Sequence, residues 1–204
     1  MNELYLVRHG QSVWNAEGRI QGQAESPLTV LGREQASHIG RYLNVILAQT
    51  ELAIYTSPLQ RALSTAQIIA EHLGYSSAEV HVDERLNDFD LGILSGYQGW
   101  DKVAIEHPEL ARLRLADPMR FHPPDGESGA DVIVRITDFL DQLPSAGPAT
   151  LIVCHGVINK FIRCVRRNIS GADIIALGES QYSVFKLVGA DETEIDLETI
   201  KESI

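Results

Sequence analysis

Two short apolar runs, each leading into a histidine that is followed by a glycine, constrain the fold of this chain more than any other feature. The strand expected at 3–8 contains the apolar run 4–7 and leads through Arg8 into His9, and the apolar residues 151–154 lead into His155. Such runs are typical of strands that helices cover on both faces of a parallel sheet. Open α/β sheets hold their ligands at the carboxyl ends of the strands. If the two strands are parallel neighbours, both histidines therefore reach one crevice.

The rest of the chain alternates between strand and helix patterns, which predicts an α/β fold. We expect three layers, α/β/α, with a mostly parallel central sheet and an insertion over the active site at the carboxyl ends of the strands. In the helix predicted over 58–73, Ser57 is the expected N-cap and Pro58 is the expected first helical residue. Further strands are expected at 52–55, 80–82, 180–188 and 193–197, the last two as antiparallel edge strands, and helices at 29–47, 58–73, 128–143 and 157–167. The Gly-, Pro- and His-rich stretch 91–126 is the predicted insertion.

Length, charge and cysteine content limit the class of protein. The 204 residues suit a single domain over 1–204. The net charge of −11 argues against a nucleic-acid or anionic-membrane partner. No apolar run approaches the roughly 18 residues of a membrane span, and the N-terminus lacks a secretory signal pattern. We interpret Cys154 and Cys164 as reduced thiols, which favours a cytoplasmic protein.

The residues beside these strand ends point to an anion. Arg8 precedes His9, and a permanent cation there disfavours a metal; the sequence has no HxH, HExxH or CxxC motif either. A guanidinium fork suits phosphate or carboxylate. Arg61 lies in the first turn of a predicted helix, where an anion is favoured. A charged His155 could offset phosphoryl charge in a transition state.

A phosphoryl-transfer site that releases an alkoxide needs a proton donor, and a carboxyl group can serve. The segment "DERLNDFDLGILSG" offers Asp83, Glu84, Asp88 and Asp90. The residues alone do not choose among them.

Taken together, the motifs resemble the histidine phosphatase superfamily, also called the phosphoglycerate mutase-like family. "LVRHGQSVWNAEGRIQG" resembles its signature R-H-G-[EQ]-[ST]-x-x-N and the loop that follows. "SPLTVLGREQA", "YTSPLQRALSTAQIIA", "LNDFDLGILSG" and "IVCHG" resemble its later elements, in the same order. The similarity runs to about residue 188, so it covers most of the chain.

The resemblance implies a role for each matching residue. His9 is the expected nucleophile, which becomes phosphohistidine, and Asp88 is the expected proton donor. The phosphate pocket is expected to contain Arg8, Arg61 and His155. The resemblance further implies substrate contacts from Asn15, Gln21 and Gly22, and from Glu127 and Ser128 in the loop "PDGES".

Two positions depart from the family pattern. Asp88 is one methylene shorter than the usual glutamate, so Asp90 is the first alternative acid. Cys154 stands where serine is common, and we interpret it as a small buried residue, with a redox-sensitive role as the alternative.

The expected activity is metal-independent hydrolysis of a small phosphorylated metabolite, without a cofactor. The resemblance implies that mutases carry a longer, more basic insertion after the acid, so we favour a phosphatase. A cofactor-dependent phosphoglycerate mutase and a non-catalytic phosphate-binding module are the alternatives. The sequence does not show the oligomeric state, although homodimers are common in the family.

Overall fold

The fold is built around one six-stranded mixed sheet. The computed structural model describes residues 3–48, 50–169 and 171–197. The strand order is β3-β2-β4-β1-β5-β6, in which β1 to β4 run parallel and β5 and β6 antiparallel to their neighbours. The strands are β1 (Leu4–Arg8), β2 (Leu52–Thr56), β3 (Val80–Val82), β4 (Ala149–Cys154), β5 (Ser183–Val188) and β6 (Asp191–Asp196). Every predicted strand is present, and β6 rather than β5 forms the edge.

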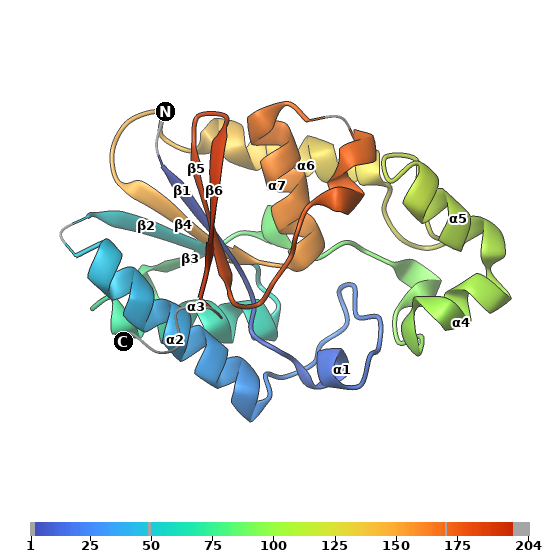
Figure 1. Cartoon of the computed structure of the whole chain (residues 1–204), viewed down its shortest axis with the longest axis horizontal. Helices are drawn as coiled ribbons and strands as arrows, with labels where there is room; N and C mark the ends of the chain where they lie inside the picture. The colour runs from blue at the N-terminus through green and yellow to red at the C-terminus, as the bar shows by residue number, and fades with distance from the viewer. Residues whose placement is uncertain (1–2, 49, 170, 198–204) are drawn as a thin grey trace.

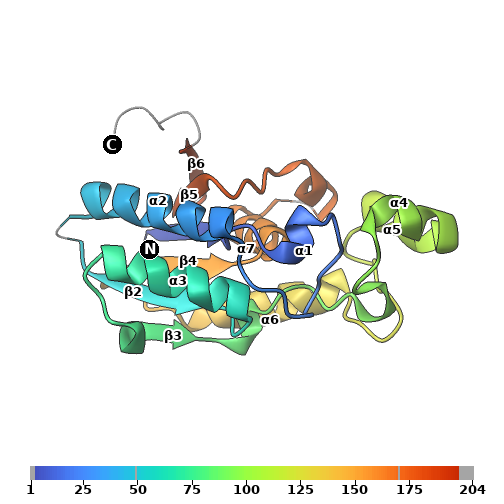
Figure 2. The same ribbon diagram turned by 90° about the horizontal axis from the view of Figure 1, so that it is seen from below.

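Helices cover both faces of the sheet, as Figures 1 and 2 show. Alternate β-strand side chains enter two cores: Tyr5 and Val7 pack with α2 and α3, whereas Leu4 and Leu6 pack with α6 and α7. This is the expected three-layer α/β/α arrangement. The helices are α1 (Val13–Ala16), α2 (Val30–Ile46), α3 (Gln60–His72), α4 (Gly99–Glu106), α5 (Pro108–Ala116), α6 (Gly129–Gln142) and α7 (Gly156–Arg167), with 3₁₀ turns at Ser77–Glu79, Glu84–Leu86, Gly92–Leu94 and Gly171–Ala176. None of the described helices is long and apolar enough to cross a membrane.

The start of α3 differs from the prediction. The helix begins at Gln60, and its N-cap is Leu59, which makes no side-chain capping bond. Ser57 Oγ accepts a hydrogen bond from the Leu59 amide at 3.3 Å, but Ser57 itself lies before the helix. Its hydroxyl contacts His155 instead, at 2.8 Å. A capping signal in the sequence therefore marks a residue of the site.

The register of β1 and β4 places the two strand-end histidines side by side. Arg8 pairs with Cys154 in the parallel ladder. The amide of His9 donates to the Cys154 carbonyl at 2.9 Å, so pairing continues past the end of β1. His9 and His155 thus leave the same edge of the sheet at the same level, as the two His-Gly motifs predicted.

The stretch 91–126 forms the expected insertion at the carboxyl edge. It contains α4 and α5, which lie beyond the carboxyl ends of the strands, at one end of the molecule (Figures 1 and 2). Val103 and Phe121 join the same core as α6 and α7, which ties the insertion to the domain. Trp100 packs on Phe121 with ring centroids 6.1 Å apart.

Two glycines bring the loop after His9 against the first turn of α2. A Cβ atom on Gly10 would lie 2.1 Å from the Gly32 carbonyl oxygen, and one on Gly32 would lie 2.1 Å from the Gln11 carbonyl oxygen. Real Cβ atoms do not approach oxygen so closely, so only glycine fits at either position. The backbone that follows His9 is therefore seated directly on the backbone of α2.

Candidate active site

A cavity of about 280 Å³ lies at the carboxyl edge of the sheet, beneath the insertion. Its lining includes six of the residues that the sequence analysis selected, together with aromatic side chains from the insertion and α7. The predicted residues in the lining are Arg8, His9, Asn15, Gln21, Gly22 and Asp88. His155 and Arg61 lie directly behind Asp88 and contact it, as described below.

His9 has a defined tautomer. Its Nδ1 atom lies 2.7 Å from the carbonyl oxygen of Gly10. A carbonyl oxygen only accepts, so Nδ1 carries the proton and Nε2 keeps its lone pair. Burial lowers the pKa of His9 well below its usual value, and the charges of His155, Arg61 and Arg8 lower it further. Near neutral pH, His9 is therefore an uncharged imidazole with a free nucleophilic nitrogen.

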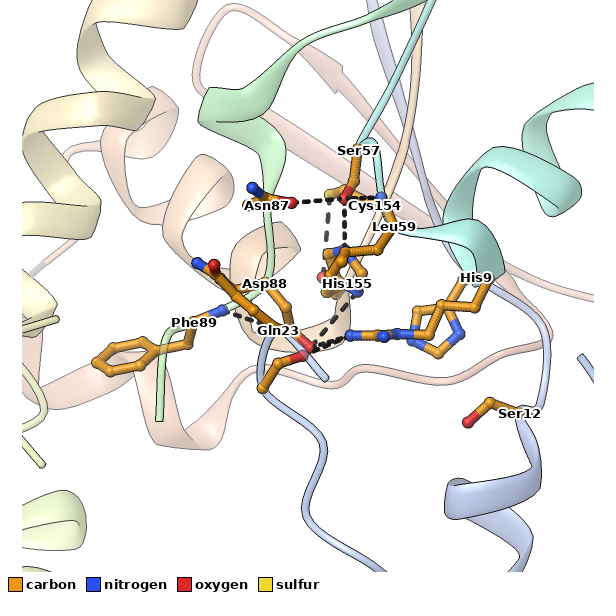
Figure 3. Close-up of polar contacts among 12 residues, drawn as sticks. His9, Ser12, Gln23, Ser57, Leu59, Asn87, Asp88, Phe89, Cys154 and His155 are labelled. Carbon is orange, nitrogen blue, oxygen red and sulfur yellow. Dashed lines mark hydrogen bonds and ion pairs between the residues drawn. The ribbon is translucent and has the colours of Figure 1, made fainter. Parts of the chain in front are cut away.

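His155 is the second imidazole of the site. Its ring centroid lies 5.2 Å from that of His9. Nε2 contacts Ser57 Oγ at 2.8 Å, and Nδ1 lies 3.4 Å from Asp88 Oδ2 (Figure 3). Burial lowers the pKa of His155, and the charges of Arg61, Arg8 and Arg135 lower it further. A bound phosphoryl anion would act in the opposite sense and favour the protonated ring.

Arg61 places a buried positive charge behind the cavity. Its side chain has 0% exposure, and its guanidinium donates to the Gly22 and Ala24 carbonyls at 2.6 and 2.8 Å. Nη2 also donates to Asp88 Oδ2 at 3.0 Å. Nε is buried and has no partner among the described residues. The loop thus fixes the fork of Arg61, and the Nε–H and one Nη1–H are left to donate to an anion.

Asp88 is the acid that the fold brings to the histidines. Its Oδ1 accepts from the Phe89 amide at 2.9 Å, and its Oδ2 faces both Arg61 and His155. Asp90, the alternative acid, turns away: its Oδ1 accepts from the Gly92 amide at 3.0 Å and it does not line the cavity. The geometry favours Asp88 as the proton donor.

Arg8 and Asn15 supply donors on the other side of the cavity. Arg8 Nη1 donates to the Glu179 carbonyl at 2.8 Å, while its buried Nε has no partner among the described residues. Asn15 Oδ1 accepts from the Ser12 amide and from Gln181 Nε2. Since both contacts use the amide oxygen, the Asn15 NH₂ group stays available to donate to a phosphoryl oxygen.

The loop residues Gln21 and Gly22 both line the cavity. Gln21 is buried, and its Oε1 atom has no partner among the described residues. Gly22 has φ of +55°, and a Cβ atom there would lie 3.0 Å from the Phe89 carbonyl oxygen. This left-handed turn aims the Gly22 carbonyl at Arg61.

Glu127 and Ser128 do not line the cavity. Glu127 forms an ion pair with Arg135 at 2.7 Å and accepts from the Asp90 amide at 2.9 Å. Ser128 is the N-cap of α6. The structure therefore places this loop behind the site rather than in it. Glu127 holds Arg135, which donates to the backbone carbonyls of Arg85 and Asp88.

Cys154 is enclosed behind His155. Its side chain is fully buried, and Sγ lies 2.8 Å from Asn159 Oδ1. Burial raises the pKa of this thiol well above its usual value. Since the thiolate is the reactive form, this position agrees with a packing residue rather than a redox-sensitive one.

Sequence reasoning missed four residues that complete the surroundings of the cavity. Ser57 contacts His155, and Arg114, Lys160 and Glu179 also line the cavity. Ser57 had a signal, because it lies in the quoted "YTSPLQRALS" motif, but it was interpreted as a helix cap. The other three come from distant parts of the chain, and no local spacing connects them.

Comparison with known proteins gives one family. A family model described as the histidine phosphatase superfamily, branch 1, matches residues 4–199. The probable phosphoglycerate mutase GpmB of Enterobacter sp. strain 638 is 36% identical over 169 residues, which cover 77% of this chain and 71% of that protein. The protein of the same name from Klebsiella pneumoniae strain 342 is 39% identical over 160 residues, with the same coverage.

Solved structures with this fold include phosphatases. The mycobacterial glucosyl-3-phosphoglycerate phosphatase, solved with VO3, has a TM-score of 0.78 and 29% identity and covers 96% of both chains. Bacillus stearothermophilus YhfR has a TM-score of 0.80 and 29% identity and covers 95% of both chains. The α-ribazole phosphatase of Shigella flexneri shares the fold, with a TM-score of 0.79 at 22% identity.

Proposed function

Because the chain belongs to branch 1 of the histidine phosphatase superfamily, we propose that it hydrolyses a small phosphomonoester through a phosphohistidine intermediate. One observation carries the proposal. A neutral His9 with its lone pair on Nε2 lines the cavity together with Arg8 and Asp88, and Arg61 and His155 contact the carboxyl group of Asp88 from behind. Nucleophile, cations and acid are thus all within one site.

In the first step, His9 Nε2 attacks phosphorus, and the bond from phosphorus to the leaving oxygen breaks. Arg8, Arg61 and a protonated His155 neutralise the equatorial oxygens, which is the main requirement of phosphoryl transfer. Asp88 gives its proton to the leaving alkoxide, so the product departs as an alcohol.

In the second step, the Asp88 carboxylate takes a proton from water as the water attacks the phosphohistidine. The N–P bond breaks, inorganic phosphate forms, and the His9 lone pair is restored. Side-chain cations supply the charge in both steps, so the proposal needs no metal. Within the described residues, no group of three or more His, Cys, Asp and Glu side chains is arranged to hold a metal ion.

The test is phosphate release from p-nitrophenyl phosphate in excess EDTA by the wild type, by His9→Ala and by His81→Ala. His81 is an exposed histidine of β3 and serves as the matched control. Activity that His9→Ala alone abolishes supports the proposal. Equal activity in all three proteins rejects His9 as the nucleophile. Activity that EDTA removes rejects the metal-independent step.

A second candidate, a phosphoglycerate mutase, is favoured by the names of the relatives that are 36% and 39% identical. A mutase would return the phosphoryl group to the substrate instead of passing it to water. Following 3-phosphoglycerate by ³¹P NMR separates the two: a hydrolase gives inorganic phosphate, and a mutase gives the 2-phospho isomer. If the protein only binds phosphate, neither signal appears.

A further inference from the structure

A side chain from late in the chain contacts the loop that follows β1. Gln181 lies just before β5, and β5 pairs with β1 in antiparallel register, with Val184 opposite Val7. The residues just before β5 therefore lie beside those just after β1. Gln181 Nε2 lies 3.1 Å from the His9 carbonyl oxygen and 3.1 Å from Asn15 Oδ1. One side-chain nitrogen thus bridges the expected nucleophile and a donor of the phosphate pocket.

The amide groups of Gln181 and Asn15 have a defined orientation. The His9 carbonyl oxygen can only accept, so the Gln181 atom that faces it is the NH₂ nitrogen. This nitrogen carries two hydrogens and can donate to the Asn15 oxygen as well. The Ser12 amide donates to the same Asn15 oxygen at 3.2 Å, which also requires an acceptor there. Backbone groups at both ends of the network therefore decide which atom of each amide is nitrogen.

The orientation of Asn15 matters because this residue lines the cavity. With Oδ1 bound by Gln181 and Ser12, the Asn15 NH₂ group is left to donate to a phosphoryl oxygen. A flipped amide would present its oxygen to the anion, so an attraction would become a repulsion. The described lining of the cavity does not include Gln181, so Gln181 acts through its two partners and does not touch the ligand.

Asn15 lies in a helix that gives its side chains little packing. α1 has four residues, and none of them is buried. A single helical turn is marginal in water without outside support. The hydrogen bond from the Val13 amide to the Pro27 carbonyl, at 2.9 Å, holds the backbone of α1. Gln181 adds a long-range hydrogen bond to the Asn15 side chain itself.

The segment that presents Gln181 is anchored at two points. The Gly178 carbonyl accepts from Nη1 of Arg163 at 2.7 Å, and the Arg163 side chain is 3% exposed. The Glu179 carbonyl accepts from Arg8 Nη1 at 2.8 Å. Gly178 and Glu179 are both exposed, whereas Gln181 is partly buried. The backbone before Gln181 therefore has a fixed position although it lies at the surface.

We propose that Gln181 is a positioning residue of the active site, whose NH₂ group holds Asn15 in the orientation that donates to the phosphoryl group. The same NH₂ group fixes Asn15 relative to the backbone of His9. The inference rests on the proposed function, because it concerns the phosphoryl group of the same reaction. Side-chain length is part of it: asparagine carries the same amide on a side chain one methylene shorter, which does not span both oxygens.

Three substitutions separate hydrogen bonding from packing. Gln181→Glu keeps the shape and loses the donor, Gln181→Met keeps the length without a polar group, and Gln181→Asn keeps the amide on a shorter side chain. We expect Gln181→Met and Gln181→Asn to lower kcat/KM for p-nitrophenyl phosphate by roughly tenfold, as for one lost hydrogen bond. Gln181→Glu should lose more, because its carboxylate faces two acceptor oxygens.

Gln142→Met is the matched control, because the NH₂ group of Gln142 donates to Asp138 on the surface of α6. It should keep the wild-type kcat/KM. All rates are compared below the temperature at which thermal unfolding of each variant begins. A wild-type kcat/KM in Gln181→Glu, which has the same shape as the wild type, overturns the proposal.

A double-mutant cycle with Asn15→Ala shows whether Gln181 acts through Asn15. In the Asn15→Ala background, Gln181→Met should lower kcat/KM by only a few-fold, because the Asn15 oxygen is already gone and the bond to His9 alone is lost. A general weakening of the fold would give the same loss in both backgrounds. Equal losses therefore overturn the proposal.

Binding of inorganic phosphate separates this inference from the proposed function, because it needs no turnover. Calorimetry should show roughly tenfold weaker phosphate binding by Gln181→Met than by the wild type and Gln142→Met. If this difference appears but no ester is hydrolysed, the positioning role stands and only the proposed hydrolysis fails. Hydrolysis with equal kcat/KM and equal phosphate binding in wild type and Gln181→Met keeps the hydrolase and rejects the positioning role. A wild type that neither hydrolyses esters nor binds phosphate rejects both.

Discussion

Ser57 Oγ and His155 Nε2 lie 2.8 Å apart, although the two residues are separated by 98 positions in the chain. Ser57 Oγ also lies 3.4 Å from Asn87 Oδ1. The asparagine oxygen can only accept, so the serine hydroxyl donates to it and accepts from His155 Nε2. These hydrogen bonds from His155 to Ser57 and from Ser57 to Asn87 hold the ring of His155 with Nδ1 turned toward Asp88 (Figure 3).

Ser57→Ala is therefore expected to lower kcat without removing the nucleophile. A buried Nε2 donor would lose its partner, which we expect to cost roughly tenfold in rate. Ser64→Ala is the control, since its hydroxyl only accepts from Gln60 on the surface of α3. Steady-state rates with p-nitrophenyl phosphate check this. Equal rates for the two variants would show that Ser57 does not orient His155.

His9→Ala should reduce kcat by roughly 10⁴-fold or more, because no other group can form the N–P bond. Rapid quenching of the wild type into alkali should trap a phosphorylated protein, which the variant should not form. Unchanged thermal unfolding above pH 7 would show that the fold survives. A phosphorylated His9→Ala protein would move the nucleophile elsewhere.

Asp88→Asn should separate substrates by leaving group. An alkyl alkoxide needs a proton, so its kcat should fall by roughly 10²-fold, whereas p-nitrophenolate leaves without one and should lose only a few-fold. Rates for a series of alkyl and aryl phosphates give the dependence on leaving-group acidity. A uniform loss across the series contradicts Asp88 as the acid, and Asp90→Asn then becomes the next variant.

Arg135 should act as a positioning residue for that acid. It donates to the Asp88 carbonyl and is held by Glu127. Arg135→Met should therefore slow alkyl phosphates more than p-nitrophenyl phosphate, in the same sense as Asp88→Asn but by a smaller factor. Arg135→Lys keeps the charge and loses the fork, so only partial rescue is expected. Equal slowing of both substrate types indicates a role in stability alone.

The free energy of unfolding should decrease when the pH is lowered below 6.5. Burial lowers the pKa values of His9 and His155 in the folded protein, so below pH 6.5 the unfolded chain binds more protons than the folded one. The free energy of unfolding then decreases as the pH falls through 6.5 toward the folded-state pKa values. Urea titrations between pH 7.5 and 5 should show a shallower decline in His155→Gln. An equally steep decline in the variant would mean that His155 is not the group responsible.

Much of the fold, and the position of the two histidines in the site, could be predicted because local sequence patterns specify them. Residues 4–7 and 151–154 are apolar at every position, which indicates strands inside a sheet, and the parallel pairing of these strands puts His9 and His155 together. Asp88 and Asp90 lie two positions apart in one acidic segment, so the residues alone do not choose between them. Only the turn that ends on Gly92 decides that Asp90 faces away.

The positions of Arg114, Lys160 and Glu179 in the cavity could not be predicted from the sequence, for a physical reason. α5 has no fully buried residue, and only Leu110, Ala111 and Leu113 pack partly against the core, so its apolar pattern is too weak to predict its orientation. Arg114, Lys160 and Glu179 meet only because the insertion and α7 pack on a common core. Glu127 shows the reverse case: its motif predicted a substrate contact, but Arg135, in the second turn of α6, binds its carboxylate instead.

The contact between Gly10 and Gly32 ties catalysis to a helix that lends the cavity no side chain. At these two glycines the loop that follows the nucleophile meets α2 backbone to backbone, so no side chain can move aside to make room for a Cβ atom. A single methyl group at Gly32 must displace the peptide beyond His9, and Nε2 shifts with it. A substitution at Gly10 or Gly32 should therefore lower the melting temperature and kcat together, even though no described residue of α2 lines the cavity.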